Sequence, residues 1–119
     1  MELVFDNNTP IYLQLLEYFK VMIISGKYNL GDKLPSVREF AITLKVNPNT
    51  VQKALSELED LGLIFTERTN GKFVTNDKDL VNKIKNEYAE SVSKKYIENM
   101  QKIGFSKNEV EKFLKDFCK

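Results

Sequence analysis

Apolar residues recur every three to four positions along much of the chain, which is the spacing of helices with one buried face. The first such helix is expected to begin at Thr9 and Pro10, because threonine is a good N-cap and proline suits the first helical position. It should run to Ile24 or Ser25 and end before Gly26. We expect its apolar face to lie in the core, and that face contains Ile11, Leu15, Leu16, Phe19, Met22 and Ile23.

A second, shorter helix is predicted to begin at Ser36, because Ser36 and Glu39 have the spacing of a capping box. In that motif the two side chains accept hydrogen bonds from backbone N–H groups that have no partner inside the helix. The preceding residues 26–35 contain two glycines and a proline, which indicates a loop or a short strand. Lys45 and Val46 form the turn that follows the helix. Its buried face is expected to contain Val37, Phe40, Ala41 and Leu44.

A third helix should begin at Asn47 and Pro48, again a capping residue followed by proline, and end at Gly62. Its inner side is expected to contain Val51, Ala54, Leu55, Leu58 and Leu61. Two short capped helices separated by a few residues are the pattern of a helix-turn-helix.

A hairpin is predicted directly after these helices, from two β-prone runs at residues 63–68 and 72–75. Between them, Asn70-Gly71 is the sequence of a tight primed turn, which needs a positive φ at both positions. A hairpin in this place is the wing of a winged helix-turn-helix. The sequence therefore predicts a mainly α domain with a small β-hairpin over residues 1–75, followed by a helical tail over residues 76–119.

The tail should contain a long helix that begins at Asp77 or Asp79 and ends at Gly104. About 24 residues of helix extend some 36 Å, and the chain has too little left to cover such a rod. Its apolar strip contains Leu80, Val81, Ile84, Tyr88, Val92, Tyr96, Met100 and Ile103. We therefore expect another molecule to pack there.

Ser106 and Glu109 form a second capping box, which predicts a last helix with one apolar side. That side contains Val110, Phe113, Leu114 and Phe117. We expect a homodimer in which a second copy covers the two tail helices. The candidate dimerisation residues are Leu80, Val81, Ile84, Tyr88, Val92, Tyr96, Met100, Phe113 and Phe117.

The composition indicates an ordinary globular protein, with 119 residues, 42% of them hydrophobic and 29% charged. This length leaves no room for a separate catalytic or ligand-binding domain of usual size. No apolar run approaches the length of a membrane span, and the first residues lack the basic flank of a signal peptide, so a cytoplasmic protein is expected. The single cysteine, Cys118, has no partner for an intramolecular disulfide.

The sequence contains few candidates for catalytic residues. Histidine is absent, which removes the commonest general base and the commonest transition-metal ligand. No pair of carboxylates stands out in an apolar setting, and there is no Gly-rich phosphate loop. We therefore expect no catalytic residues, no metal and no cofactor.

The net charge of +1 argues by itself for neither nucleic acid nor membrane. Residues 1–76 contain 8 Lys/Arg and 9 Asp/Glu, and residues 77–119 contain 10 and 8. Within the third helix, however, residues 47–56 include Lys53 and no acid, whereas Glu57, Glu59 and Asp60 lie at the far end. Acids at that end oppose the helix dipole, so keeping them away from a phosphate backbone would explain the arrangement.

In a helix-turn-helix, the amino end of the second motif helix enters the major groove, where amide side chains suit adenine. Arg38 can reach a phosphate or a guanine edge, although an ion pair with Glu39 or Asp32 is the structural alternative. The tip of the wing brings cations and a bare glycine backbone to one place, which suits phosphates or the minor groove. The candidate DNA-binding residues are Ser36, Arg38, Asn47, Asn49, Thr50, Gln52, Lys53, Arg68, Asn70, Gly71 and Lys72.

Residues 34–74 resemble the DNA-binding domain of the GntR family of bacterial transcription regulators. The matching pieces are LPSVREFA at 34–41, VNPNTVQKAL at 46–55, LEDLGLI at 58–64 and NGKFV at 70–74, and the helix that starts PIYLQL at residue 10 extends the likeness. The resemblance implies that operator DNA contacts Arg38, Asn49, Thr50, Gln52 and Gly71. Many relatives carry arginine in place of Pro48 and Gln52 and glycine in place of Thr69, so it does not imply an operator sequence or a wing geometry.

The short helical tail is similar to that of the YtrA subfamily, which implies a dimerisation element and regulated genes that often encode ABC transporters. Together these observations predict a homodimeric repressor that binds double-stranded operator DNA with an inverted repeat. Two alternatives remain: a winged-helix adaptor that binds protein, and a small sensor that binds an effector between the tail helices. For the sensor, a pocket could be lined by Tyr88, Tyr96, Phe105, Phe113 and Phe117. An enzyme is the least favoured class.

Overall fold

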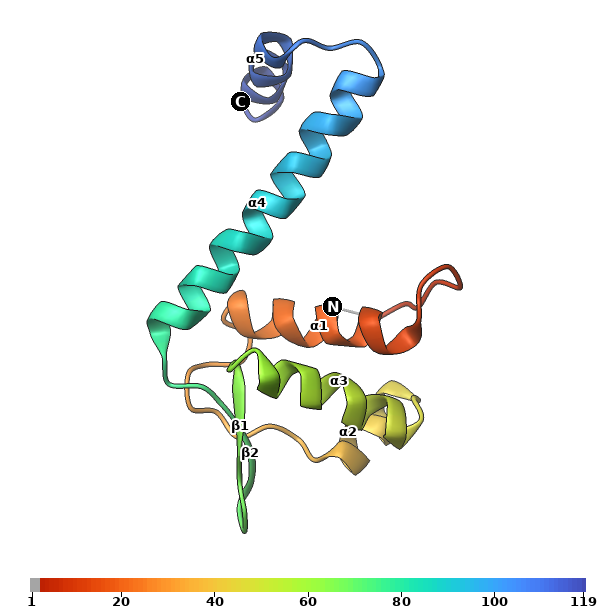
Figure 1. Ribbon diagram of the computed structural model, residues 1–119, viewed down its shortest axis with the longest axis vertical. Helices are drawn as coiled ribbons and strands as arrows, with labels where there is room; N and C mark the ends of the chain where they lie inside the picture. Colours follow the sequence, from red (N-terminus) through yellow and green to blue (C-terminus); the bar gives the residue numbers. More distant parts are fainter. Residues whose placement is uncertain (1–2) are drawn as a thin grey trace. The chain divides into compact units, whose positions relative to one another are not determined.

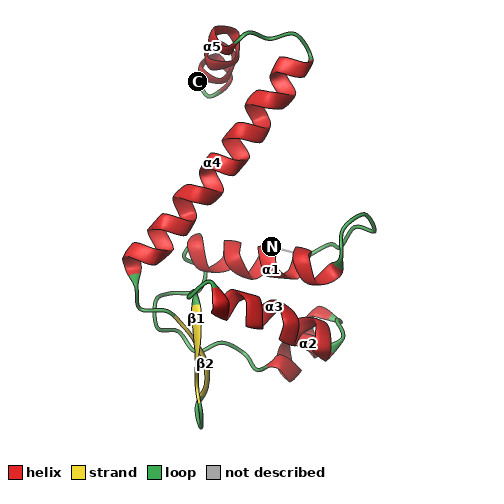
Figure 2. Ribbon diagram, in the orientation of Figure 1, coloured by secondary structure: helices red, strands yellow, loops and turns green. Residues whose placement is uncertain are grey.

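The computed structural model describes residues 3–119, so the first two residues of the expected 1–75 domain lie outside it. Over this range the chain forms five helices and one two-stranded antiparallel hairpin (Figures 1 and 2). This confirms the predicted mainly helical fold with a small hairpin. The elements are α1 Ile11–Ile24, α2 Val37–Leu44, α3 Pro48–Asp60, β1 Ile64–Glu67, β2 Gly71–Val74, α4 Lys78–Lys102 and α5 Lys107–Phe117.

The chain divides after Lys83 into two compact units. Unit 1 contains α1, α2, α3, the hairpin and the first turns of α4. Unit 2 contains the rest of α4 together with α5. None of the helices in residues 3–119 is long and apolar enough to cross a membrane.

The start of α1 differs from the prediction that Thr9 caps it. Pro10 occupies the N-cap position, and its carbonyl oxygen accepts hydrogen bonds from the backbone N–H of Leu13 at 3.1 Å and of Gln14 at 3.4 Å. No side chain caps the helix. Instead, the Gln14 side-chain amide donates to the Thr9 carbonyl oxygen at 2.7 Å and binds the backbone of Asp6, so it organises the segment that precedes the helix. The predicted Thr9 cap was therefore wrong.

The core of unit 1 lies where α1 packs beside α3, with α2 near the amino end of α3 (Figure 1). The rings of Phe19 on α1 and Phe40 on α2 lie 4.8 Å apart and tilted, which is a favourable arrangement of aromatic side chains. Two residues predicted for the core are exposed: Ile11 at 46% and Leu61 at 41%. Ile11 is the first residue of α1, and Leu61 is the C-cap of α3. The largest fully buried side chains are Leu15, Val51, Leu55, Leu58, Leu63, Ile64 and Val74.

The predicted capping box of α2 is present. The backbone N–H of Glu39 donates to Ser36 Oγ, and the backbone N–H of Ser36 donates to Glu39 Oε1, both at 3.1 Å. These hydrogen bonds favour the ionised carboxylate, so they lower the pKa of Glu39. Ser106 and Glu109 make the same box at the start of α5, with the same effect on the pKa of Glu109.

Lys45 ends α2 with a φ of 56°, in the left-handed region, and is the one residue other than glycine with a positive φ in residues 3–119. This conformation lets the backbone N–H of Val46 reach the Ala41 carbonyl oxygen at 3.1 Å and closes the turn of the helix-turn-helix. A side chain in this region costs about 1–2 kcal/mol. The turn is therefore formed at the expense of local strain.

Replacing Lys45 with glycine should stabilise the protein by about 0.5–1 kcal/mol, because glycine removes the strain and loses slightly more chain entropy on folding. Urea denaturation would measure this, with Lys45→Ala as the control, since alanine removes the exposed side chain but keeps the strain. Equal stability of the glycine and alanine variants would contradict the argument.

The hairpin pairs Ile64 with Val74 and Glu67 with Gly71, so residues 68–70 connect the strands. The predicted two-residue primed turn was therefore wrong, since Gly71 has a φ of 105° but Asn70 does not have a positive φ. The backbone N–H of Asn70 donates to the Glu67 carbonyl oxygen at 3.2 Å, and its side-chain amide donates to the Glu67 carboxylate at 3.0 Å. These two bonds hold Asn70 within the turn and leave Gly71 to start β2.

A third segment runs along β2, where Lys33 bridges to Phe73. The backbone N–H of Leu34 donates to the Lys72 carbonyl oxygen at 2.9 Å, and that of Val74 donates to the Asp32 carbonyl oxygen at 2.8 Å. The region predicted as a loop or short strand thus supports the outer edge of the wing.

Asp77 begins α4, as one of the two predicted alternatives, because its carboxylate accepts a hydrogen bond from the backbone N–H of Leu80 at 3.1 Å. Of the predicted apolar strip, Val81 and Ile84 are buried within the single chain, at 9% and 8% exposure. Val92 is 53% exposed. Leu80, Tyr88, Tyr96 and Met100 are half-buried.

Candidate nucleic-acid interface

The amino end of α3 presents polar side chains on a rigidly capped helix. Asn47 is the N-cap, and its side-chain oxygen accepts a hydrogen bond from the backbone N–H of Asn49 at 2.8 Å. Pro48 fills the first helical position, as predicted. The oxygen of Asn47 is therefore committed to the cap, whereas Asn49 is exposed and Thr50 is half-buried beside it.

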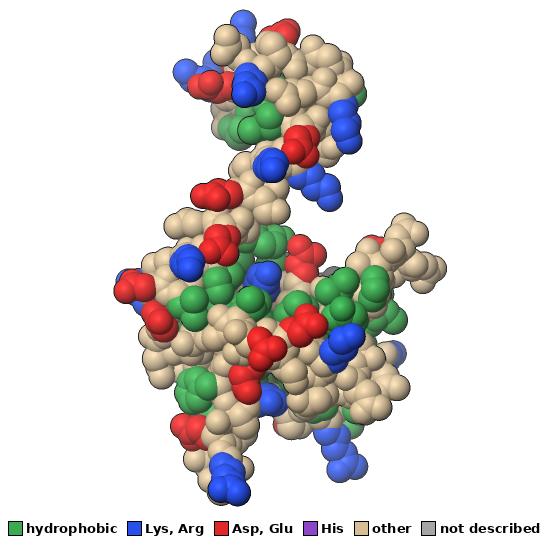
Figure 3. Space-filling model, viewed as in Figure 1, with side chains coloured by type: hydrophobic (Ala, Val, Ile, Leu, Met, Phe, Trp, Pro, Cys, Tyr) green, Lys and Arg blue, Asp and Glu red, His purple; other side chains and the backbone are tan. Residues whose placement is uncertain are grey.

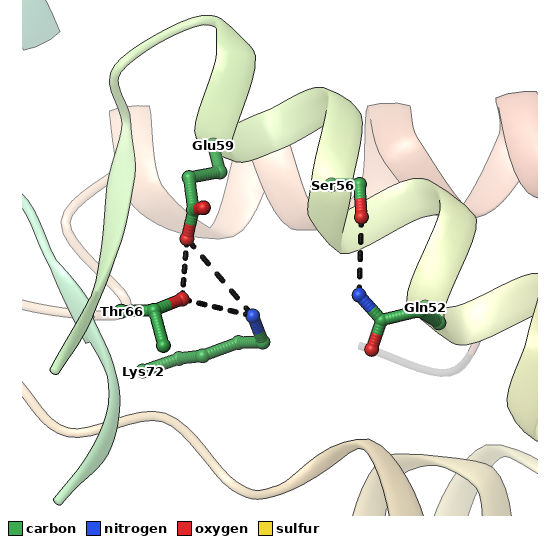
Figure 4. A network of polar contacts seen from close by, with 5 residues as sticks. All are labelled: Gln52, Ser56, Glu59, Thr66 and Lys72. Carbon is green, nitrogen blue, oxygen red and sulfur yellow. Dashed lines mark hydrogen bonds and ion pairs between the residues drawn. The ribbon is translucent and has the colours of Figure 1, made fainter. Parts of the chain in front are cut away.

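Gln52 lies one turn further along the exposed side of α3. Its side-chain amide donates to Ser56 Oγ at 3.0 Å (Figure 4). Both groups are exposed, so water or a base edge can replace this hydrogen bond at little net cost. Gln52 is therefore exposed and can exchange this partner, and its role in reading a base stays a prediction.

Lys53 does not extend freely from α3. Its ammonium lies over the ring of Tyr12 on α1, 3.7 Å from the ring centroid, which is a cation–π contact. The two side chains line a shallow hollow of about 440 Å³ together with Ile11, Asn49 and Thr50. The structure thus places this cation against α1, and a base contact would require it to leave the ring.

Arg38 is the second residue of α2 and is exposed. The ion pairs that would have explained it structurally are not formed within residues 3–119. Glu39 is engaged in the capping box, and the Asp32 carboxylate accepts a hydrogen bond from the backbone N–H of Asn29 at 2.7 Å. Both candidate acids therefore have other roles, and Arg38 projects from the surface without one of them.

The two cations predicted for the wing tip do not occupy equivalent positions. Arg68 is exposed in the connection between the strands. The side chain of Lys72 is only 18% exposed, and its ammonium lies 3.9 Å from Glu59 Oε1 and 3.0 Å from Thr66 Oγ1 (Figure 4). The sequence analysis did not foresee this contact, in which an acid on α3 draws Lys72 toward the helix.

Lys33 is a cation near the wing tip that the sequence analysis missed. It is exposed, and its Cε lies 3.5 Å from the point where a side chain on Gly71 would begin. Nothing in the local pattern indicated this position, because the contact arises from the bridge between Lys33 and Phe73. Arg68 is thus the exposed basic residue of the wing, and Lys33 is a second exposed cation beside it.

Charge on the surface is mixed rather than concentrated. Figure 3 shows basic and acidic side chains interspersed on the face in view, which agrees with the near-neutral net charge. One of the acids at the carboxyl end of α3, Glu59, has a structural role that the sequence analysis did not find, because it binds the wing. For Glu57 and Asp60, keeping carboxylates away from phosphates stays a prediction.

The exposed side chains of this surface are of the types that bind nucleic acid. Amide, hydroxyl and guanidinium groups match base edges and phosphates. In residues 3–119, no cluster of three or more Cys, Asp or Glu side chains could hold a metal ion.

Comparison with known proteins identifies the domain. Residues 11–74 match the family described as "Bacterial regulatory proteins, gntR family". The chain is 37% identical over 113 residues to the uncharacterized HTH-type transcriptional regulator YhcF of Bacillus subtilis, covering 95% of this chain and 93% of that protein. It is 46% identical over 69 residues to the HTH-type transcriptional repressor YtrA of the same organism, covering 58% of this chain and 53% of that repressor.

Comparison with solved structures leads to the same family. A GntR family transcriptional regulator from Listeria monocytogenes superposes with a TM-score of 0.88 at 40% identity, covering 94% of this chain and 98% of that one. The DNA-binding domain of AraR, in complex with operator ORX1, superposes with a TM-score of 0.58 at 28% identity, covering 63% of this chain and 96% of that one. The chain therefore belongs to the GntR family, in its YtrA-like subfamily, and is a transcription regulator with a DNA-binding winged helix-turn-helix rather than an enzyme.

Proposed function

We propose that this regulator binds an inverted-repeat operator as a homodimer and represses the adjacent genes. The observation that carries the proposal is the division of charge and hydrogen-bonding groups on unit 1. Asn49 and Gln52 are exposed in the first two turns of α3, the proposed reading helix, and Arg38 is exposed on the first turn of α2. The acids of α3 are confined to its last turn. The amino end of α3 can therefore approach the floor of the major groove without bringing carboxylates near phosphates.

Within this arrangement α3 reads bases through Asn49, Thr50 and Gln52, and Arg38 binds a phosphate or a guanine. The wing contributes Arg68 and the backbone at Gly71 to phosphates or to the minor groove. Ser36, Asn47 and Asn70 hold the backbone of these contact segments, because each is bound to a neighbouring main-chain or side-chain group. The operator complex of the AraR domain supports a DNA-binding role for this fold.

We assign dimerisation to unit 2, because several of its large apolar side chains are exposed. The ring of Phe105, just before α5, and the rings of Phe113 and Phe117 on α5 form a row, with neighbouring centroids 5.7 Å and 6.2 Å apart. Phe113 is 47% and Phe117 is 77% exposed. Unit 2 also contains a groove of about 670 Å³, and its apolar lining residues are Val92, Tyr96, Ile97, Val110 and Leu114. Patches of this kind mark interaction surfaces.

Val81 and Ile84 leave little surface for a partner, since they are already buried in the single chain. The proposed interface is therefore centred on Val92, Tyr96, Met100, Phe113 and Phe117. The helical tail over residues 76–119 remains a proposed dimerisation element. The relative named YtrA is described as a repressor, which supports the proposal that this regulator represses its target genes.

The proposal is tested by fluorescence anisotropy with duplexes that carry the complete inverted repeat from the upstream promoter, one half-site, or a scrambled sequence. The complete repeat should bind at least about tenfold more tightly than one half-site, because the second subunit then binds without a new loss of translational freedom. Affinity should fall linearly on a log–log plot against salt, with a slope of about −0.9 per phosphate neutralised. Sedimentation equilibrium should give two chains per operator. Equal affinity for all three duplexes would rule out the operator role.

A further inference from the structure

Three polar side chains connect the last turn of α3 to the wing (Figure 4). The Thr66 hydroxyl on β1 donates a hydrogen bond to Glu59 Oε1 and accepts one from Lys72 Nζ at 3.0 Å. Lys72 Nζ also lies 3.9 Å from Glu59 Oε1. The hydroxyl thus uses its one donor and one of its two acceptor lone pairs, and both charged side chains bind it. We call Glu59, Thr66 and Lys72 the wing clamp.

The wing clamp occupies the outermost core-facing position of the hairpin. Thr66 and Lys72 are directly paired across the strands, and so are Ile64 and Val74 two residues further in. Because side chains two apart on a strand share a face, both pairs point to the same side. Ile64 and Val74 are 2% and 0% exposed, so that side is the core. The next ladder pair outward faces the other way, and the clamp is the last point on this side where α3 can hold the wing.

Lys72 is less exposed than expected for a lysine whose ammonium is free to bind a phosphate. Its side chain is 18% exposed and has two polar partners within 4 Å. Arg68, the other cation of the hairpin, is exposed and makes no ion pair within residues 3–119. Lysine buries its aliphatic stem readily, but it seldom loses this much exposure at a hairpin unless the ammonium is bound.

We propose that the wing clamp sets the direction of the wing relative to the reading helix, so that Glu59 and Lys72 are positioning residues for DNA binding. Arg68 and the backbone at Gly71 then make the wing's contacts with DNA, while Lys72 makes none. This inference rests on the proposed function, because it assumes that α3 and the wing bind one duplex. Since α3 enters the major groove, a wing held at a fixed angle delivers its tip to a defined place on the same duplex.

The first test compares the two cations of the hairpin. Lys72→Met and Arg68→Met each remove one positive charge and keep a long side chain. Arg68→Met should reduce the magnitude of the salt slope by about 0.9, the value for one phosphate contact. Lys72→Met should leave the slope unchanged and weaken operator affinity roughly three- to tenfold, because the wing becomes misdirected. A slope lowered by about 0.9 in Lys72→Met would overturn the proposal.

The second test compares two acids on the same helix end. Glu59→Ala and Asp60→Ala remove the same charge, but only Glu59 belongs to the clamp. If the only effect were less repulsion between the acid and the DNA phosphates, both substitutions would increase the operator affinity equally. The clamp predicts that Glu59→Ala binds the operator roughly three- to tenfold more weakly than Asp60→Ala, and that adding Lys72→Met to Glu59→Ala causes no further loss. Equal affinities of the two single variants, or additive losses in the double variant, would contradict it.

A measurement on the free protein separates this inference from the proposed function. Backbone order parameters from NMR should fall at residues 66–72 in Glu59→Ala and remain at the wild-type value in Asp60→Ala. If wild-type protein shows no preference for the operator, the proposed function fails while this measurement still tests the clamp. If the operator binds but the order parameters of both variants equal those of the wild type, the clamp fails alone.

Discussion

Replacing Arg38 with alanine should weaken operator binding about tenfold to a hundredfold while leaving the fold unchanged. Arg38 is exposed on the first turn of α2, and the acids that could have held it structurally, Glu39 and Asp32, are bound elsewhere. Its guanidinium therefore breaks no ion pair with these two acids when it binds DNA. Hydrogen bonds to charged groups contribute about 1.5–3 kcal/mol, which corresponds to the stated range of affinity.

The Arg38 prediction is checked by anisotropy titrations of the operator at several salt concentrations. If Arg38 binds a phosphate, the magnitude of the salt slope should fall by about 0.9, whereas contact with a guanine edge should reduce preference for the operator over scrambled duplex. Lys27→Ala is the matched control, because it removes an exposed cation from the loop after α1. The prediction fails if the two variants bind alike, or if Arg38→Ala melts at a markedly lower temperature.

Replacing Leu55 with alanine should lower the free energy of unfolding by about 2–5 kcal/mol. Leu55 is 0% exposed on the inner side of α3, between the helices of unit 1. The substitution removes buried methyl groups and leaves a cavity that close-packed neighbours only partly fill. Such a loss is a large share of the stability of a typical domain, so DNA binding near body temperature should decline with it.

Leu61→Ala is the control for Leu55→Ala, since it makes the same chemical change at the end of the same helix. Leu61 is 41% exposed, and we expect a loss below about 1 kcal/mol. Guanidinium denaturation of the two variants and the wild type would measure both values. A loss at Leu61 as large as at Leu55 would show that the helix end is covered and that the description of the core is incomplete.

Features that depend on neighbours in the chain were predictable from the sequence. The capping boxes at Ser36 and Ser106, the Asn47-Pro48 start of α3 and the end of that helix at Gly62 all rest on bonds within one turn. The same holds for the order of helices and hairpin that indicated a winged helix-turn-helix. Local hydrogen bonding and φ preferences determine these features, so a short window of sequence contains the required information.

Features for which two polar groups compete were not predictable. Thr9 has the right type for a cap, but Gln14 recruits the preceding backbone and leaves Pro10 at the helix start. Lys72 has the right type for a phosphate contact, but Glu59 lies on a helix that folds back against the hairpin. In each case another polar group competes for the residue, and only the folded chain shows which partner is near.

The buried side and the exposed side of α3 are subject to different constraints. Val51, Ala54, Leu55 and Leu58 are all buried at 0% exposure, whereas Asn49 and Gln52 are exposed. Substitutions on the outer side can therefore change which operator is preferred with little effect on folding. Among duplicated genes, this separation gives a lineage a route to regulators with new targets, through a few codons and without rebuilding the scaffold.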